Sequence, residues 1–353
     1  MSGGESLHIP DGYLSPSTCA VAAGAMTPVW LSAGRRVRKV VTNRYAPLTA
    51  LAAAYCFCVM MFNVPVPDGT TAHAVGAVLV AVLLGPWAAV VAVSVALAIQ
   101  ALFFGDGGVL AYGANALNMA FVMPFVGYGV YLAIARRAPL TSRRRAVAAG
   151  VGGYVGLNAA ALAAAVEFGI QPLLFHTADG TPLYAPFHLS QTIPAMALAH
   201  LTVAGGVEFA LTMGVVTYLQ RANVPLLRIN HPTTAVNATT ELPPSRRRWR
   251  SAVVVFAVGA LLTPLGLLAH GRAFGEDAPG ALDLHKNHLQ AVPDGLARYA
   301  GFWHHALFHG YDFSHDAHPA VGYIVSALVG MAAISGVAFA VVSLIARVRS
   351  AVR

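Results

Sequence analysis

The chain has 353 residues, of which 57% are hydrophobic and only 10% are charged, and its formal net charge is +8. Soluble domains contain about 25% charged residues, so this composition excludes an ordinary soluble domain and indicates that the chain lies in a lipid bilayer. A basic soluble protein would suggest nucleic acid as a partner. Here no basic patch interleaved with aromatic residues supports that partner. The positions of the basic residues along the chain instead fit the loops of a membrane protein.

Apolar stretches long enough to cross a bilayer follow one another along the chain. A crossing needs about 20 apolar residues. The candidate spans, in chain order, are about 17–34, 46–62, 73–104, 112–135, 146–170, 191–219, 251–269 and 320–346. The stretch 73–104 is interrupted by Gly85-Pro86-Trp87, which favours a turn inside it.

The basic residues fix the expected orientation of these spans. Nineteen of the 22 Lys and Arg residues lie in four clusters, within 35–44, 136–145, 221–250 and 347–353. Such clusters mark cytoplasmic loops. The first two clusters must then lie on the same side of the membrane, so an even number of crossings separates them. The spans 46–62 and 112–135 supply two of these crossings, and 73–104 must therefore cross twice. The sequence therefore predicts an all-α polytopic membrane protein with nine spans, its N-terminus outside and its C-terminus inside.

The spans fall into two units joined by a linker. We expect residues 1–219 to form a seven-span bundle, 220–250 a polar cytoplasmic linker, and 251–353 a two-span module. The outer loop of that module, residues 270–319, contains eight of the 14 histidines. A basic inner side and a histidine-rich outer side suggest a protein that handles a metal ion outside the cell.

Two further histidines are predicted at the outer face of the first unit. His8 precedes a Pro-Asp-Gly turn, and His73 follows the turn-forming segment 65–71. A lone histidine at a helix start is usually structural, but two at one face favour a ligand pair. Asn115 and Asn118 lie three residues apart on one helix face, where they either line a cavity or hold helices together.

Five motifs, in order, resemble the CbiM/NikM family. They are His-Ile-Pro-Asp-Gly-Tyr-Leu-Ser at 8–15, Gly-Thr-Thr-Ala-His at 69–73, Leu-Leu-Gly-Pro-Trp-Ala-Ala at 83–89, Phe-Gly-Asp-Gly-Gly at 104–108, and Gly-Ala-Asn with Asn-Met at 113–119. This family comprises the substrate-binding membrane components of energy-coupling factor (ECF) transporters for cobalt and nickel. The resemblance covers about 7–227. Pro-Asp-Gly-Leu at 293–296 is similar to the small accessory component of these systems (CbiN/NikN), here fused at the C-terminus.

The resemblance implies a substrate, partners and a location. Cobalt(II) or nickel(II) is the transported substrate, bound at the outer face of the bacterial inner membrane. The partners are a transmembrane coupling (T) protein and two ABC-type ATPases. The sequence contains no Walker A motif, so we expect the ATP sites to belong to those other chains.

The resemblance also implies a ligand set. The metal is held by a free α-amine, the amide nitrogen and ring of the next residue, His8, and a second histidine, His73. Tetragonal nitrogen ligation of this kind suits nickel(II). Six residues precede Leu7, so it offers an amine only if translation starts there, which is what we expect. Gln100, Asn115 and Asn118 are candidates for the surrounding polar layer.

The outer-loop histidines leave several interpretations open. His304, His305 and His309 either assist metal loading or are incidental residues of a solvated loop. His305 and His309 at i,i+4, and His285 and His288 at i,i+3, would each share a metal on one helix face. The run His304-His305-x-x-x-His309 also loosely resembles one box of a membrane di-iron oxygenase. Such enzymes need several boxes, so we expect no enzyme; a self-contained metal channel or carrier is the other alternative.

Overall fold

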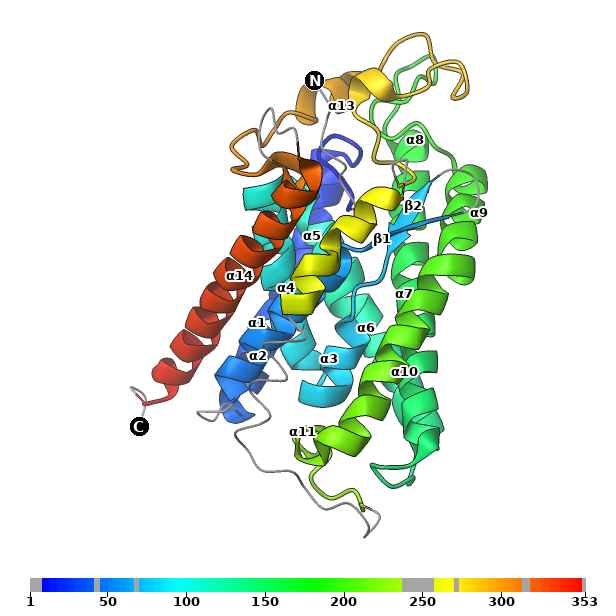
Figure 1. Cartoon of the computed structure of the whole chain (residues 1–353). Helices are drawn as coiled ribbons and strands as arrows, with labels where there is room; N and C mark the ends of the chain where they lie inside the picture. The colour runs from blue at the N-terminus through cyan, green and yellow to red at the C-terminus, as the bar shows by residue number, and fades with distance from the viewer. Residues whose placement is uncertain are drawn as a thin grey trace.

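The computed structural model of the chain shows long helices running between the two ends of an elongated molecule (Figure 1). It describes residues 8–40, 45–66, 70–236, 257–269, 273–312 and 318–350, without the side chains of 39–40 and 346–350. Five helices are long and apolar enough to cross a membrane: Pro86–Phe104, Tyr112–Ala135, Arg143–Leu174, Leu189–Ala222 and Pro319–Ile345. The predicted polytopic, mainly helical membrane protein is confirmed.

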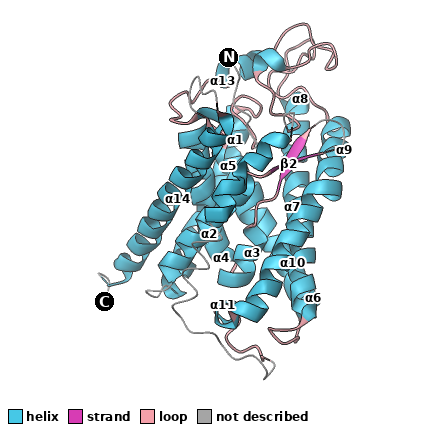
Figure 2. Ribbon diagram, in the orientation of Figure 1, coloured by secondary structure: helices cyan, strands magenta, loops and turns pink. Residues whose placement is uncertain are grey.

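The first half of the chain contains α1 to α6 and one small sheet (Figure 2). The elements are α1 (Pro16–Val40), α2 (Tyr45–Met60), β1 (Asn63–Pro65), β2 (Thr71–His73), α3 (Ala77–Leu84), α4 (Pro86–Ile99), a π-helical turn (Gln100–Phe104), α5 (Tyr112–Ala116), a second π-helical turn (Leu117–Val122) and α6 (Met123–Ala135).

The second half contains two long helical segments and a loop-rich region before the last helix. The elements are α7 (Arg143–Gly169), α8 (Gln171–Leu174), α9 (Leu189–Ala199), a third π-helical turn (His200–Ala204), α10 (Gly205–Ala222), α11 (Val224–Arg228), 3-10 turns at Thr263–Leu268, Pro279–Ala281 and His309–Tyr311, α13 (Asp294–Tyr299) and α14 (Pro319–Ser350).

Residues 73–84, expected to make the first of the two crossings within 73–104, contain only a short helix. Helix α3 has eight residues, which corresponds to about 12 Å, less than half of the bilayer's apolar thickness. An antiparallel hairpin precedes it, in which Asn63 pairs with His73 and Pro65 with Thr71. Proline and β-branched threonines favour extended backbone, which explains the strands and corrects the all-α prediction.

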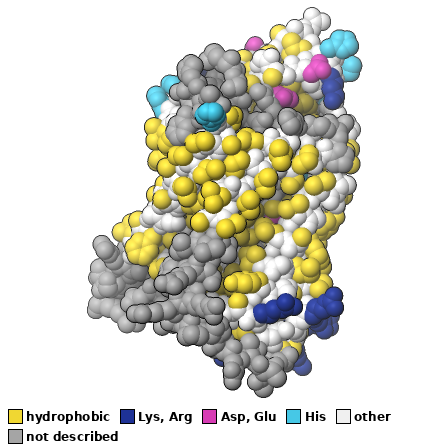
Figure 3. Space-filling view, in the orientation of Figure 1, with side chains coloured by type: hydrophobic (Ala, Val, Ile, Leu, Met, Phe, Trp, Pro, Cys, Tyr) yellow, Lys and Arg dark blue, Asp and Glu magenta, His cyan; other side chains and the backbone are white. Residues whose placement is uncertain are grey.

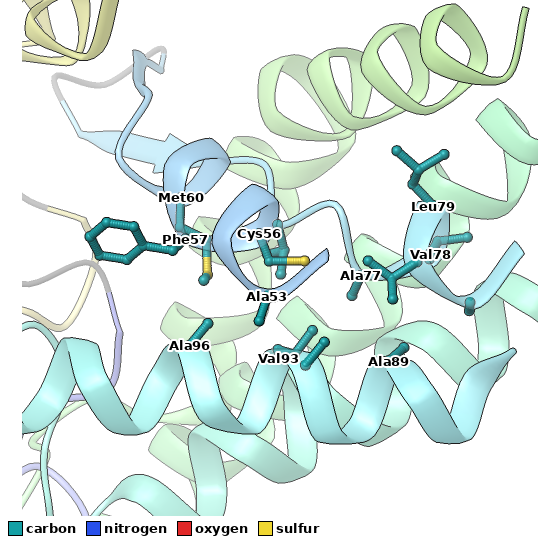
Figure 4. Close-up of a cluster of buried hydrophobic side chains, with 14 of the residues drawn as sticks. Ala53, Cys56, Phe57, Met60, Ala77, Val78, Leu79, Ala89, Val93 and Ala96 are labelled. Atoms are coloured by element: carbon teal, nitrogen blue, oxygen red, sulfur yellow. The ribbon is translucent and has the colours of Figure 1, made fainter. Parts of the chain in front are cut away.

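Small side chains allow the central helices to pack closely around α4. Figure 4 shows Ala53 and Cys56 of α2 and Ala77 of α3 above Ala89 and Val93 of α4. All five are fully buried. Close approach of backbones through small residues is the usual basis of helix packing in membranes. This core supports the short α3 and the hairpin that precedes it.

The two ends of the molecule carry different side chains. In Figure 3 a broad apolar band separates most of the visible Lys and Arg residues, at one end, from most of the visible histidines and acids, at the other, where one basic patch also lies. We call these the arginine end and the histidine end. The histidine end is built from 8–15, 105–111, 175–188 and 273–312, and the arginine end from 35–38, 136–145 and 221–236. Helix α14 packs mainly against α2 and also against α4 and α1.

His231 lies at the arginine end, outside the spanning helices. Its Nε2 is 3.3 Å from the hydroxyl of Tyr131, to which Arg145 donates a hydrogen bond. Burial, and then the positive charge of Arg145, lower the pKa of His231 to about 4. The unfolded chain binds a proton at an ordinary histidine pKa of about 6.5.

Between pH 6.5 and 4 the unfolded state therefore binds more protons, and the free energy of unfolding should decrease as pH falls through this window. We expect the unfolding temperature in detergent to fall by a few degrees over that range because of this group. The fall should be smaller in His231→Gln; an equal fall in both proteins would rule out the assignment.

Candidate metal site

His8 and His73 lie side by side at the histidine end, although 65 positions separate them in the sequence. Their ring centroids are 5.1 Å apart and the rings are nearly perpendicular, at 72°. Both side chains are buried, with 3% and 8% of their surface exposed. A metal–nitrogen bond is about 2 Å long, so one ion can contact both rings at this spacing.

The backbone next to His8 is held by the loop 105–111. The amide of Asn115 makes two hydrogen bonds to Ile9, accepting from its N–H at 3.1 Å and donating to its carbonyl at 3.0 Å. Asp11 accepts from the amides of Val109, Leu110 and Ala111. Burial raises the pKa of Asp11, and these hydrogen bonds oppose the rise. The position of the backbone at His8 is thus fixed by residues about 100 positions further along the chain.

The backbone next to His73 is held by a buried carboxylate. Glu208 of α10 is fully buried and accepts hydrogen bonds from the amides of Val75 at 2.8 Å and Gly76 at 3.0 Å. Gly76 has φ +75, a conformation that suits glycine, and Tyr55 fills the space where a side chain would lie. Glu208 therefore sets the turn that follows His73.

Hydrogen bonds also determine which ring nitrogens are available. Nδ1 of His73 is 3.0 Å from the carbonyl of Ala74, and an N–H there leaves the lone pair on Nε2. Nδ1 of His8 is 3.0 Å from Oδ1 of Asp106. In that arrangement Nε2 of His8 carries the lone pair that could bind a metal. The chelate expected from the family would instead use the backbone amide of His8 together with Nδ1 of the same ring.

Both histidines line one cavity of about 90 Å³, enough for several waters or a hydrated ion. Asn115 and Asn118 line it too, and Asn118 donates to Glu167 at 2.7 Å. His200 lines another part of the cavity. Its Nδ1 contacts the carbonyl of Met196, whereas Glu208 bonds to the turn after His73.

Two imidazoles alone do not complete a metal site. No group of three or more His, Cys, Asp or Glu residues that could hold a metal occurs in the part of the chain that the structure describes. Residue 7, the predicted amine donor, lies outside those residues. Further donors for an ion between His8 and His73 would be water, a backbone atom or that amine.

One predicted residue of the polar layer, Gln100, makes its hydrogen bonds to two residues that were not predicted. Its amide donates to Asp106 and to Tyr311. Asp106 and Tyr311 were missed as contributors to the site. The Phe-Gly-Asp-Gly-Gly motif contained the signal for Asp106, but nothing near Tyr311 in the sequence links it to a residue 205 positions away.

The outer-loop histidines do not form the predicted helical pairs. Residues 303–306 are not helical, and His309 begins a separate 3-10 turn, so His305 and His309 do not share a helix face. His285 and His288 lie in a turn, because His288 adopts φ +54. His304 and His305 are exposed and their ring centroids are 4.2 Å apart. A role for His304, His305 and His309 in loading stays a prediction.

Comparison with known proteins identifies the family. The family model described as cobalt uptake substrate-specific transmembrane region, CbiM, matches residues 8–226. The chain belongs to this family. The resemblance drawn from the five motifs is therefore confirmed.

Members of the family resemble the chain over different lengths. The fused nickel transport protein NikMN of Rhodobacter capsulatus is 49% identical over 346 residues, which are 93% of this chain and 95% of that protein. A crystal structure of a transition metal transporter is 54% identical, with a TM-score of 0.58, and matches 64% of this chain and 98% of its own. A truncated transition metal transporter is 57% identical, with a TM-score of 0.56, over 60% of this chain and 97% of its own.

These relatives are transport proteins. The chain is accordingly a multi-pass membrane transport protein of a nickel and cobalt family, and the expectation that it is not an enzyme is confirmed.

Proposed function

We propose that the chain is the metal-capturing component of an energy-coupling factor importer for cobalt(II) or nickel(II), located in the bacterial inner membrane. The observation that carries the proposal is the pair of buried imidazoles, His8 and His73, 5.1 Å apart in one cavity at the histidine end. Nitrogen ligands suit both ions, and the choice between them depends partly on metal availability in the cell.

The two histidines are the proposed metal ligands. They come from segments that share no secondary structure, and each is fixed by its own buried acid or amide, Asn115 near His8 and Glu208 near His73. Such outer partners orient metal ligands and are expected around a functional site. An incidental contact between two surface histidines would have neither the burial nor these partners.

The proposed working start of the chain is residue 7. A chain that begins there would add its α-amine and the amide of His8 as donors in two small chelate rings, closed through Nδ1 of His8. An amine six residues earlier would close a large flexible ring at a greater ordering cost. Intact-mass measurement of the native protein should give a chain that begins at residue 7. A mature chain that begins at Met1 or Ser2 and still binds the ion tightly would contradict this.

The proposed topology has nine crossings, with the histidine end outside the cell. Its support is the separation of basic and histidine-bearing ends (Figure 3), with the hairpin and α3 together making the third crossing. The proposed modules remain 1–219 and 251–353, joined by the linker 220–250. Reporter fusions after Arg145 and Arg250 should indicate cytoplasm and one at Asp294 the outside. A cytoplasmic signal at Asp294 would overturn the arrangement.

The proposed partners are a transmembrane coupling protein and two ABC-type ATPases, which would supply the energy. Nickel and cobalt uptake should be measured in cells that express the whole set and in cells that lack only this chain. We expect uptake to depend on the chain. Equal uptake in the two strains would contradict the proposed function.

A further inference from the structure

Residues 273–277, in the loop-rich region before the last helix, form part of the wall of the metal cavity. Ala273, Phe274 and Glu276 line the cavity, as do both proposed ligands. The amide of Glu276 donates to the carbonyl of Ala273 at 3.2 Å, which closes a tight turn in this segment. Side chains from the last third of the chain therefore surround an ion held by histidines from its first quarter.

An aromatic cluster holds this segment in place. The ring of Tyr13 lies 5.9 Å from that of Phe168 and 6.2 Å from that of Phe187, between centroids. The hydroxyl of Tyr13 donates to the carbonyl of Asp277 at 2.7 Å. The ring of Phe274 lies 4.8 Å from that of Phe187. The cluster thus contacts the segment on both sides of residues 275–276.

Gly275 allows the segment to approach the cluster closely. It is buried and has φ +79, a conformation that suits glycine, and the ring of Phe168 occupies the space where a side chain would lie. The contacts of Phe274, Gly275 and Asp277 together fix where the side chain of Glu276 meets the cavity.

Glu276 brings a negative charge to this wall. Of the described residues that line the cavity, it is the only one with a carboxylate side chain, and none of the described histidines between 273 and 312 lines the cavity. Oε2 of Glu276 is buried, whereas the residue as a whole is half-buried. The carboxylate therefore lies between the surface and the interior of the cavity.

Such a carboxylate attracts a divalent cation before the ion meets the imidazoles. Charge in a cleft with apolar walls raises the local concentration of ions of opposite sign and speeds their binding. Imidazole nitrogen suits nickel(II) and cobalt(II), whereas carboxylate oxygen suits harder ions such as magnesium and calcium. An ion that first contacts Glu276 therefore binds more favourably when it moves on to the two histidines.

We propose that Glu276 is the ion-attracting residue of the metal cavity: its carboxylate draws in hydrated nickel(II) or cobalt(II) and passes it to His8 and His73. Its contact with the ion is transient, so the final ligands are unchanged, including a chelate that closes through Nδ1 of His8 in a chain that begins at residue 7. The inference rests on the proposed function, because it takes the two histidines as the final ligands.

The test measures how fast the chain, purified in detergent with its native N-terminus, binds nickel(II), followed by the visible absorption of the bound ion. Glu276→Gln keeps the shape of the side chain and removes its charge. We expect the association rate to fall about 10-fold, the lower end of the effect of focused charge in a cleft, with little change in the dissociation rate. Glu276→Ala, a second variant without the charge, should behave in the same way.

Salt provides a measurement that a purely structural role would not change. Rising ionic strength should slow association in the unsubstituted chain, because it screens the attraction between Glu276 and the ion, and should slow it less in Glu276→Gln. Glu276→Asp retains the charge and should retain this salt dependence. The spectrum of the bound ion should be the same in all of these proteins, because the final ligands are the same.

Asp283→Asn is the matched control. It removes one negative charge from the same loop-rich region, at an exposed residue that does not line the cavity. Asparagine can still accept the hydrogen bond that Asp283 takes from the amide of Lys286. The association rate and its salt dependence should match those of the unsubstituted chain.

An unchanged association rate in Glu276→Gln would overturn the inference and leave the proposed function intact. A changed spectrum would also overturn it, because the carboxylate would then be one of the final ligands. An equal loss of rate in Asp283→Asn would assign the effect to the overall surface charge and would contradict the role of Glu276. Failure of the unsubstituted chain to bind either ion would instead overturn the proposed function, and the inference with it.

Discussion

His8→Ala and His73→Ala should each reduce metal affinity by more than roughly 100-fold, the upper limit for loss of a mere outer partner. Both imidazoles line one cavity, and their ring centroids are 5.1 Å apart, so one ion can contact both. An ion that loses one of them would leave a partly desolvated charge with an incomplete set of ligands. Uptake in cells that contain the partner proteins should fall to the level of cells without the chain.

The control for these variants is a histidine with access to water. His318 is exposed at the start of α14, so water can replace it as a ligand and His318→Ala should change affinity only slightly. Calorimetric titration of the purified variants with nickel(II) and cobalt(II) compares them directly. Normal binding by His8→Ala would mean that the ligand set implied by the family does not apply to this chain.

Glu208→Ala should lower both stability and metal affinity. The substitution leaves the buried amides of Val75 and Gly76 without an acceptor, at a cost of about 1–3 kcal/mol each. The turn after His73 would then move to find other partners, and the ring of His73 would move with it. We expect a decrease in affinity of about 10-fold or more, as for other residues that orient metal ligands.

Glu208→Gln is the matched variant, because both amides donate to Oε2 and the amide oxygen of glutamine in that place can still accept both hydrogen bonds, although a neutral oxygen is a weaker acceptor than a carboxylate. It should lie between Glu208→Ala and the unsubstituted chain in unfolding temperature and in nickel affinity. If Glu208→Ala lowered the unfolding temperature but left nickel affinity unchanged, the carboxylate would have a structural role that does not extend to His73.

Patterns that extend along the chain predicted most of the fold. The lengths of the apolar stretches and the clusters of arginines identified the spanning helices. Both features depend on the surrounding bilayer more than on contacts between particular residues. The hairpin at 63–73 was missed because the apolar stretch 73–84 resembles a span. So short a helix as α3 is supported by its packing against α4, α6 and α7. The spacing of apolar residues along the sequence does not show which other helices a short helix packs against.

The candidate site was likewise predicted in part. Ordered motifs indicated that His8, His73 and Asn115 belong together, and the structure places all three around one cavity. The contact between Asp106 and Tyr311 joins residues 205 positions apart, and no local pattern in the sequence encodes it. The pairing of His305 with His309 failed for the opposite reason, since it assumed a helix that the backbone does not form there.

Anomalous X-ray diffraction at the nickel absorption edge, from crystals of the nickel-loaded chain, would locate the bound ion. We expect one strong peak in the cavity, about 2 Å from an imidazole nitrogen of His8 and of His73. A peak beside the exposed pair His304 and His305, with none between His8 and His73, would contradict this expectation.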